Sequence, residues 1–261
     1  MIRLCKYIDT TIFRSDEVPF IVSEYHFTAA LDELLGRAGS GEILLKKIQF
    51  TVRKVSKGDS LHHIGDEVSS LYCVMSGWLT SSRELANGDR QILGFHVPFD
   101  LVGFEYLGRA DAVSTLTAYE ETSVISIPIG SLKKAIEGMP GGAMAIASML
   151  SRRLAAAQTR LCVFSNGKAH VKLAHLFHGL RSKQIRRGVT DYNVLNIPFT
   201  QSDIADLLGM TNVTVNRQMK RLREENCVSF KSGKIVILDY ERLMSFSDGL
   251  IDSTVAVDEF D

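Results

Sequence analysis

The sequence lacks several features that would mark a membrane-spanning or secreted protein. Its 261 residues contain no stretch of 18 apolar residues, which argues against a membrane-spanning helix. Residues 1–9 lack the long apolar core of a signal peptide. The four cysteines form no C-x-x-C motif and no evident disulfide framework; they are Cys5, Cys73, Cys162 and Cys227. We therefore expect a cytoplasmic protein with reduced thiols and no association with a membrane.

The chain has no net charge, but its charges are unevenly distributed. Lysine and arginine minus aspartate and glutamate gives 17 − 18 = −1 for residues 1–165, 13 − 7 = +6 for residues 166–246, and 0 − 5 = −5 for residues 247–261. Positive charge attracts phosphate, so residues 166–246 are the candidate nucleic-acid-binding segment. The length allows two domains, and the acidic end is expected to be a solvated tail.

The basic segment contains a pattern typical of a helix-turn-helix. Thr200 is followed three residues later by Asp203, which resembles a capping box and predicts a helix start. Gly209 suits the left-handed residue that ends that helix. Thr211 can then act as the N-cap of a second helix over about 212–224.

The second helix has a clear division between apolar and polar positions. Val215, Met219 and Leu222 recur at i, i+4 and i+7 and are expected to be buried. The residues left facing outward are Asn212, Val213, Asn216, Arg217 and Lys220. Residues 228–238 alternate about a basic tip and predict a hairpin. The order of these elements (helix, turn, helix and hairpin) favours a winged helix-turn-helix, which places its second helix in the DNA major groove. The alternative is a pair of core helices with a surface hairpin.

Residues 48–130 are typical of many short strands. Glycine-containing turns recur between β-rich runs such as 70–75, 91–97 and 123–128. This spacing favours a closed antiparallel roll over β-α-β units. A preceding helix is predicted to cover one end of the roll, from the spacing of Phe27, Ala30, Leu31, Leu34 and Leu35.

A long helix is predicted over about 141–164. Its apolar seam repeats at spacings of four and three, through Ala143, Ala147, Leu150, Leu154, Ala157, Leu161 and Phe164. Such a seam suits pairing with an identical helix in a dimer. The alternative is an ordinary helix packed on its own domain.

The chain from about residue 45 to 240 resembles the CRP/FNR family of bacterial transcription regulators. The matching segments include Gly58-Asp59, residues 72–77, 100–103 and 151–154, and, best of all, residues 200–222 with Gly233-Lys234. The recognition helix, with Val213-x-Val-Asn-Arg217, is most similar to members common in alphaproteobacteria.

The resemblance implies an α+β fold with an N-terminal antiparallel β-roll, similar to the cyclic-nucleotide-binding jelly roll, followed by a long dimerisation helix and a C-terminal winged helix-turn-helix. The expected segments are an N-terminal extension and covering helix (1–44), a sensor roll (45–137), a dimerisation helix (138–166), a DNA-binding domain (167–246) and an acidic tail (247–261). It further implies a homodimer that binds a palindromic site in double-stranded DNA and is gated by a signal at the roll. RNA polymerase is a further expected partner, although nothing in the sequence marks a surface for it.

Arg217 is the residue most strongly predicted to read a base, through two hydrogen bonds to guanine. Asn212 and Val213 occupy the family's other base-facing positions. Many relatives have a glutamate where this chain has Val213, so the half-site is expected to differ from that of the best-known members. The predicted phosphate contacts are Thr200, Gln201, Thr211, Thr214, Lys220 and Lys234.

The effector is not identified by the sequence. The resemblance places a candidate pocket at Gly103, Glu105, Val113 and Ser114. Valine stands where cyclic-nucleotide members have their phosphate-binding arginine, which argues against cyclic AMP unless Arg109 substitutes. An iron–sulfur cluster of the family's N-terminal type is not expected, because only Cys5 lies in that region.

Two classes of function follow. The first is a DNA-binding regulator, either gated by an effector or binding constitutively. The second is a cupin-like enzyme or small-molecule binder whose winged domain contacts proteins, suggested by His62, His63 and Glu67. Adjacent residues of a strand point to opposite faces, so both histidines cannot enter the roll without a bulge, and no metal site is predicted.

No motif supports haem ligation through His96, Cys73 or Met75. Cys162 is expected to be a plain buried cysteine, with a redox switch as the alternative.

Overall fold

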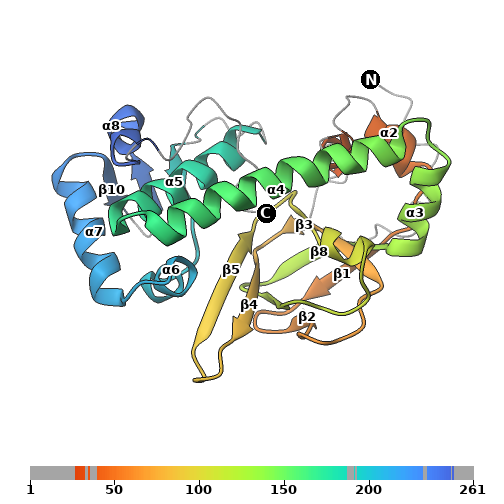
Figure 1. Ribbon diagram of the computed structural model, residues 1–261, viewed down its shortest axis with the longest axis horizontal. Helices are drawn as coiled ribbons and strands as arrows, with labels where there is room; N and C mark the ends of the chain where they lie inside the picture. Colours follow the sequence, from red (N-terminus) through yellow and green to blue (C-terminus); the bar gives the residue numbers. More distant parts are fainter. Residues whose placement is uncertain are drawn as a thin grey trace. The chain divides into compact units, whose positions relative to one another are not determined.

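The structure is a computed structural model that describes residues 27–32, 35, 40–186, 191, 193–231, 234–247 and 249. The chain divides into two compact units, Met1–Leu79 with His96–Leu150, and Thr80–Phe95 with Ser151–Asp261 (Figure 1). The predictions for residues 1–25, Cys5, Leu34 and the tail from residue 250 fall outside the described residues. Over the described ranges, no helix is both long and apolar enough to cross a membrane.

The β-roll is confirmed, and the fold class is α+β. Two four-stranded sheets have the orders β1-β8-β3-β6 and β2-β7-β4-β5. The strands are β1 (Thr51–Val55), β2 (Ser60–His62), β3 (Ser70–Ser76), β4 (Leu79–Glu84), β5 (Arg90–His96), β6 (Leu101–Val102), β7 (Thr115–Ala118) and β8 (Thr122–Pro128). β8 pairs antiparallel with both β1 and β3.

Strand β3 is buried on both faces. Leu71 and Cys73 belong to one core cluster, while Tyr72 and Val74 belong to another. This division follows from the strand period of two, which sends successive side chains to opposite faces. A run of four buried residues in a strand therefore indicates that both faces of the sheet are covered.

Short helices contribute to the core cluster that contains Leu71 and Cys73. Residues 27–32 are helical, and Phe27, Ala30 and Leu31 are buried there, as predicted for the covering helix. The other elements of this region are α2 (Ser40–Leu45), the 3₁₀ helix η1 (Phe104–Leu107) and α3 (Ile129–Glu137). Leu132 and Ile136 of α3 join the same cluster.

The predicted long helix is α4 (Gly142–Asn166), 25 residues. One face, including Met149 and Val163, is buried against the rest of the chain. The predicted seam lies on another face. Its first six members, Ala143 to Leu161, are all exposed, and only Phe164 is partly buried.

The second unit contains α5 (Ala169–Arg186), β9 (Val194–Leu195), α6 (Gln201–Leu208), α7 (Asn212–Glu224), β10 (Val228–Lys231), β11 (Lys234–Ile237) and α8 (Tyr240–Ser245). The predicted hairpin is confirmed as β10 paired antiparallel with β11, and β9 adds a third strand. Helix α5 was not predicted. Every residue from Leu173 to Leu180 is buried. A helix segment that is buried all round has no exposed polar face, so its sequence lacks the one-sided apolar stripe by which amphipathic helices are recognised.

Candidate nucleic-acid interface

Helix α6 begins with a capping box, as the sequence predicts. The Thr200 Oγ1 accepts a hydrogen bond from the Asp203 N–H at 3.2 Å, and the Thr200 N–H donates to Asp203 Oδ2 at 2.8 Å. The Thr200 hydroxyl also donates to Asp203 Oδ2 at 2.7 Å. These contacts satisfy backbone donors that the first turn of a helix leaves without intrahelical partners.

The turn between α6 and α7 depends on Gly209. Its φ of 60° and ψ of 46° lie in the left-handed region, which glycine adopts without steric cost. Thr211 then caps α7, because its Oγ1 accepts from the Thr214 N–H at 3.2 Å. The two helices therefore have the short connection expected of a helix-turn-helix.

Helix α7 presents the face that the sequence assigns to DNA. Val215, Met219 and Leu222 are buried, as predicted. The five residues expected to face outward are all exposed: Asn212, Val213, Asn216, Arg217 and Lys220. Val213 is 75% exposed, which is unusual for a valine in a packed domain. An apolar side chain so placed is available for contact with a thymine methyl group.

The residues predicted to contact phosphate lie at the surface of the same unit. Gln201, Thr211 and Lys234 are exposed, and Thr214 is partly buried. Lys220 forms an exposed ion pair with Glu224 at 3.6 Å. The Thr200 hydroxyl is engaged in the capping box, so this residue has a structural role in addition to the predicted one. The tip of the wing, residues 232 and 233, lies outside the described residues.

Comparison with known proteins agrees with this arrangement. Residues 171–246 match the model of the Crp-like helix-turn-helix domain. Residues 52–138 match the model of the cyclic nucleotide-binding domain. The chain belongs to the CRP/FNR family. Its members are DNA-binding transcription regulators, so the protein is a regulator and not an enzyme.

Relatives of known name cover most of the chain. The fumarate and nitrate reduction regulatory protein of Yersinia pestis is 29% identical over 226 residues, covering 87% of this chain and 84% of its own length. The protein of that name from Escherichia coli K12 is 28% identical with the same coverage. Among solved structures, FixK2 from Bradyrhizobium japonicum has a TM-score of 0.68 and 24% identity, covering 76% of this chain and 98% of its own. A CRP-family transcriptional regulator from Thermus thermophilus, TTHB099, has a TM-score of 0.58 and 17% identity, with coverages of 77% and 100%.

In this CRP/FNR regulator, the predicted effector pocket is occupied in part by Tyr106. Gly103 has a φ of 100°, and a Cβ built on it would lie 3.1 Å from the Tyr106 ring. The Tyr106 hydroxyl lies 3.1 Å from His62 Nε2. Val113 and Ser114 also hydrogen-bond this tyrosine, and burial raises its pKa to about 12. Gly103, Val113 and Ser114 therefore gather around the phenol ring.

Two charged residues lie near this site, Glu105 and Arg109. Glu105 is exposed on η1 and hydrogen-bonds Tyr106, whose pKa it also raises. Arg109, the alternative cation for a bound phosphate, is itself exposed and forms an ion pair with Asp111 at 3.0 Å. The neutral phenol of Tyr106 supplies no positive charge, so the arrangement is poorly suited to an anionic ligand.

The two adjacent histidines of the roll differ in exposure, but the strand period does not account for it: β2 ends at His62, and its pairing with β7 shifts register between Ser60 and His62. His62 is buried and stacks on Tyr72, with ring centroids 6.2 Å apart, while His63 is exposed. Burial lowers the pKa of His62. No cluster of three histidine, cysteine, aspartate or glutamate side chains able to hold a metal occurs among the described residues. Cys162 was expected to be buried, but this was wrong: it lies on the exposed side of α4.

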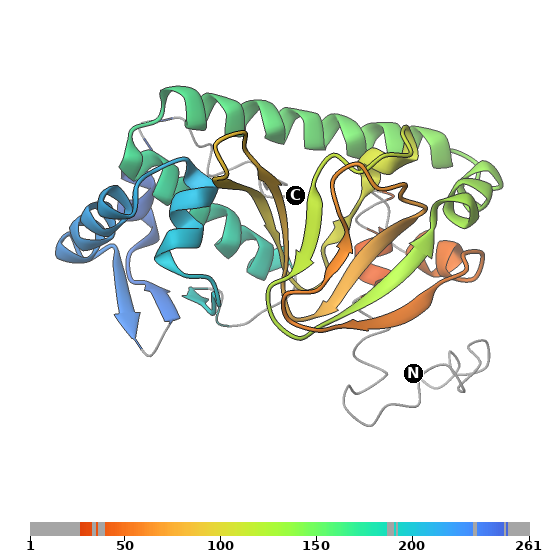
Figure 2. The same ribbon diagram turned by 90° about the horizontal axis from the view of Figure 1, so that it is seen from below.

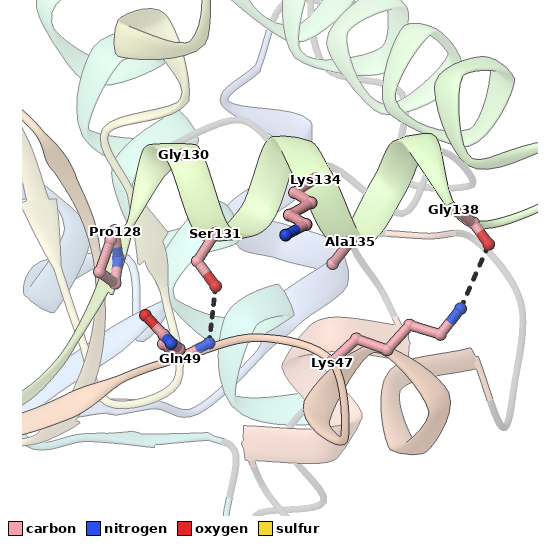
Figure 3. Close-up of a pocket in the computed structure, with 8 residues that line it drawn as sticks. All are labelled: Lys47, Gln49, Pro128, Gly130, Ser131, Lys134, Ala135 and Gly138. Carbon is pink, nitrogen blue, oxygen red and sulfur yellow. Dashed lines mark hydrogen bonds between the residues drawn. The ribbon is translucent and has the colours of Figure 1, made fainter.

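A separate pocket of about 590 Å³ lies beside helix α3 (Figure 3). The Lys47 Nζ donates to the Gly138 carbonyl oxygen at 3.2 Å, and the Gln49 N–H donates to Ser131 Oγ at 2.7 Å. Lys134 adds a second positive charge to the lining. None of the four residues predicted to bind the effector lines this pocket, so no pattern in the sequence indicated it.

Proposed function

We propose that two copies of this chain pair along α4 and bind a palindromic site in double-stranded DNA, with α7 of each copy in a major groove. The observation that carries the proposal is the joint exposure of the apolar seam of α4 and the polar face of α7. Leu150, Leu154 and Leu161 are 42, 61 and 67% exposed in the single chain. Such a stripe on a long helix is suited to burial against an identical stripe.

Arg217 is proposed as the principal base-reading residue. It is exposed in the first half of α7, the part of a recognition helix that reaches base edges. Its planar guanidinium can donate two hydrogen bonds to guanine O6 and N7, which discriminates against other bases by roughly 1–3 kcal/mol. Asn212 and Val213 precede it on the same exposed surface and are proposed to read neighbouring bases.

Phosphate contacts are proposed for Gln201, Thr211, Thr214, Lys220 and Lys234, with Thr200 acting mainly through the capping box. The excess of positive charge over residues 166–246 supports this assignment. Such contacts fix the position of the protein on the duplex and do not select its sequence. RNA polymerase is proposed as a further partner only if the outcome is activation.

The β-roll, with the boundaries 45–137 predicted from the sequence, is proposed as a sensor whose ligand, if one is required, is not a cyclic nucleotide. The buried Tyr106 beside Gly103 supports this assignment, because its ring lies among the predicted pocket residues. Binding of a cyclic nucleotide there would require the ring to move and a cation to be supplied.

The proposal is tested by selecting DNA sites in vitro with the purified, ligand-free protein. A palindrome with half-sites about one helical turn apart is expected. Affinity for that site is then measured for wild type, Arg217→Ala and Arg223→Ala. Arg223 is a matched control because it is exposed on the last turn of the same helix.

Arg217→Ala is expected to lose about tenfold or more in affinity for the selected site while keeping most of its nonspecific affinity, because it removes base contacts and not the bulk of the phosphate contacts. Arg223→Ala is expected to weaken both kinds of binding about equally. Unchanged discrimination by Arg217→Ala would show that another residue reads the site. Only sequence-blind binding by the wild type would show that the resting protein requires a signal or does not act on a palindrome.

A further inference from the structure

The hairpin formed by β4 and β5 has an unusual place in the fold. Residues 80–95 lie within the sequence of the β-roll, yet they belong to the compact unit that contains the helix-turn-helix. Figure 2 shows this hairpin in dark yellow beside the light-blue helix α6. Its strand β5 contacts α6 through side chains at one end of the strand.

Arg90 contacts the acidic side of α6. Its Nη2 lies 2.5 Å from Asp203 Oδ1 and 2.9 Å from Asp206 Oδ2, and its Nε lies 3.2 Å from the same Asp206 oxygen. The Asp203 side chain is only 7% exposed and already takes part in the capping box. One guanidinium therefore bridges two carboxylates on successive turns of the helix, an arrangement for which its fixed fork of donors is suited.

Gln91 contacts the other end of α6. Its Nε2 donates to the backbone carbonyl oxygens of Asp206 and, at 3.4 Å, Leu207. These carbonyls belong to the last turn of the helix, where intrahelical N–H donors are missing. The side-chain amide thus satisfies acceptors that the helix itself leaves open.

Two further contacts connect the hairpin to this unit. The rings of Phe95 and Phe199 are stacked, with centroids 3.9 Å apart and planes at 10°, directly before the N-cap of α6. The Arg160 guanidinium of α4 donates to the Leu93 carbonyl oxygen. The hairpin is consequently attached to α6 at its acidic side, at its C-terminal end and just before its start.

We propose that Arg90 and Gln91 are positioning residues for DNA binding, which hold α6, and through it the reading helix α7, in a fixed orientation. This inference rests on the proposed function. α6 and α7 pack together and share the Gly209 turn, so fixing one restricts the other. The reading face of α7 stays exposed while these contacts are made, which is compatible with DNA binding in the held orientation.

A dimer on a palindrome distinguishes this role from a direct contact with DNA. Both reading helices must be presented at a fixed separation to engage two half-sites, whereas one half-site requires only one helix. Loss of positioning should therefore weaken binding to the full palindrome much more than binding to a single half-site. Loss of a phosphate contact by Arg90 would weaken both.

The experiment measures affinity for the selected palindrome and for the same duplex with one half-site scrambled, at one salt concentration. The variants are Arg90→Ala, Gln91→Ala, Asp206→Asn and the double variant Arg90→Ala/Asp206→Asn. Asp203 is left intact because its loss would disrupt the capping box. Arg109→Ala is the matched control, since Arg109 is 48% exposed and paired with an aspartate in the roll, against 49% for Arg90.

Arg90→Ala and Gln91→Ala are each expected to lower the ratio of palindrome to half-site affinity by about threefold or more, a size that allows for the partial exposure of the ion pair. Asp206→Asn should also lower the ratio, and the double variant should add little to Arg90→Ala, because Arg90→Ala already removes the contact between Arg90 and Asp206. Arg109→Ala should leave the ratio unchanged.

An unchanged ratio in both Arg90→Ala and Gln91→Ala would overturn the proposal, as would an equal loss on both duplexes. A raised ratio would also overturn it and would show that the hairpin holds the reading helices away from the DNA-binding arrangement. Failure of the wild type to prefer the palindrome would instead count against the proposed function.

Discussion

Acidification should destabilise the unit that contains α5, because His175 is buried there as a neutral side chain. It has no exposed surface, and burial, together with the nearby His178 and Arg160, lowers its pKa from 6.5 to about 3. The folded state therefore excludes a proton that the unfolded chain binds below pH 6.5. For a base whose pKa is lowered in the folded state, the free energy of unfolding keeps its full value above pH 6.5 and decreases as the pH falls toward 3.

The magnitude follows from the two pKa values. At pH 5 the unfolded chain is stabilised by protonation of this histidine by about 2 kcal/mol, whereas at pH 7.5 the effect is below about 0.1 kcal/mol. Hence about 2 kcal/mol of the stability lost between pH 7.5 and pH 5 is assigned to His175.

The assay is urea unfolding of wild type and His175→Leu at pH 7.5 and pH 5, followed by circular dichroism. His175→Leu removes the titrating group with little change in volume, so its stability should fall by about 2 kcal/mol less than that of the wild type over this interval. Phe177→Leu is the control. It is a non-titrating buried substitution on the same helix and should lower stability equally at both pH values. An identical loss in wild type and His175→Leu would refute the reasoning.

Four other substitutions test the site and the fold. Leu154→Glu places a charge in the exposed seam and should convert a dimer into monomers in analytical ultracentrifugation, with loss of palindrome binding; a monomeric wild type would contradict the proposed pairing. Thr211→Ala removes the N-cap of α7 and should lower the free energy of unfolding by about 1 kcal/mol in a denaturant titration; no change would show that the cap contributes nothing. Tyr106→Phe leaves His62 without its phenolic partner and should reduce stability by about 1–3 kcal/mol, and a neutral effect would indicate that water replaces the hydroxyl. Val213→Glu should shift the base selected at its position toward cytosine, whose amino group a carboxylate accepts from; an unchanged selected site would place Val213 away from the bases.

The sequence predicts the structure best where the interacting residues are close to each other in the chain. The capping box at Thr200, the left-handed Gly209 and the N-cap at Thr211 involve residues within three positions of each other, so composition and spacing specify them. The limits of α7 and its buried positions follow in the same way from a period of 3.6. The apolar seam of α4 could be predicted in the same way, because an apolar stripe on a helix depends only on the sequence of that helix.

Contacts between residues that are far apart in the sequence could not be predicted from it, and these contacts determine the other features of the fold and the site. Nothing at Arg90 indicates that it bridges Asp203 and Asp206, which are 113 and 116 positions away, because a surface arginine on a hairpin has no periodic or spacing signal. No pattern in the sequence indicates that Tyr106 lies among the expected pocket residues, because its contact with His62 spans 44 positions. Cys162 was misassigned because burial on a helix depends on what packs against it.

The sequence by itself determined the order of roll, long helix and winged helix-turn-helix, and the face of α7 that meets solvent, since these depend on local hydrogen bonds and on the periods of strand and helix. Only the tertiary structure decided which side chain lies beside Gly103 in the roll, and which hairpin contacts α6. Those outcomes depend on which distant side chains meet, and a linear pattern carries no information on distance across the fold.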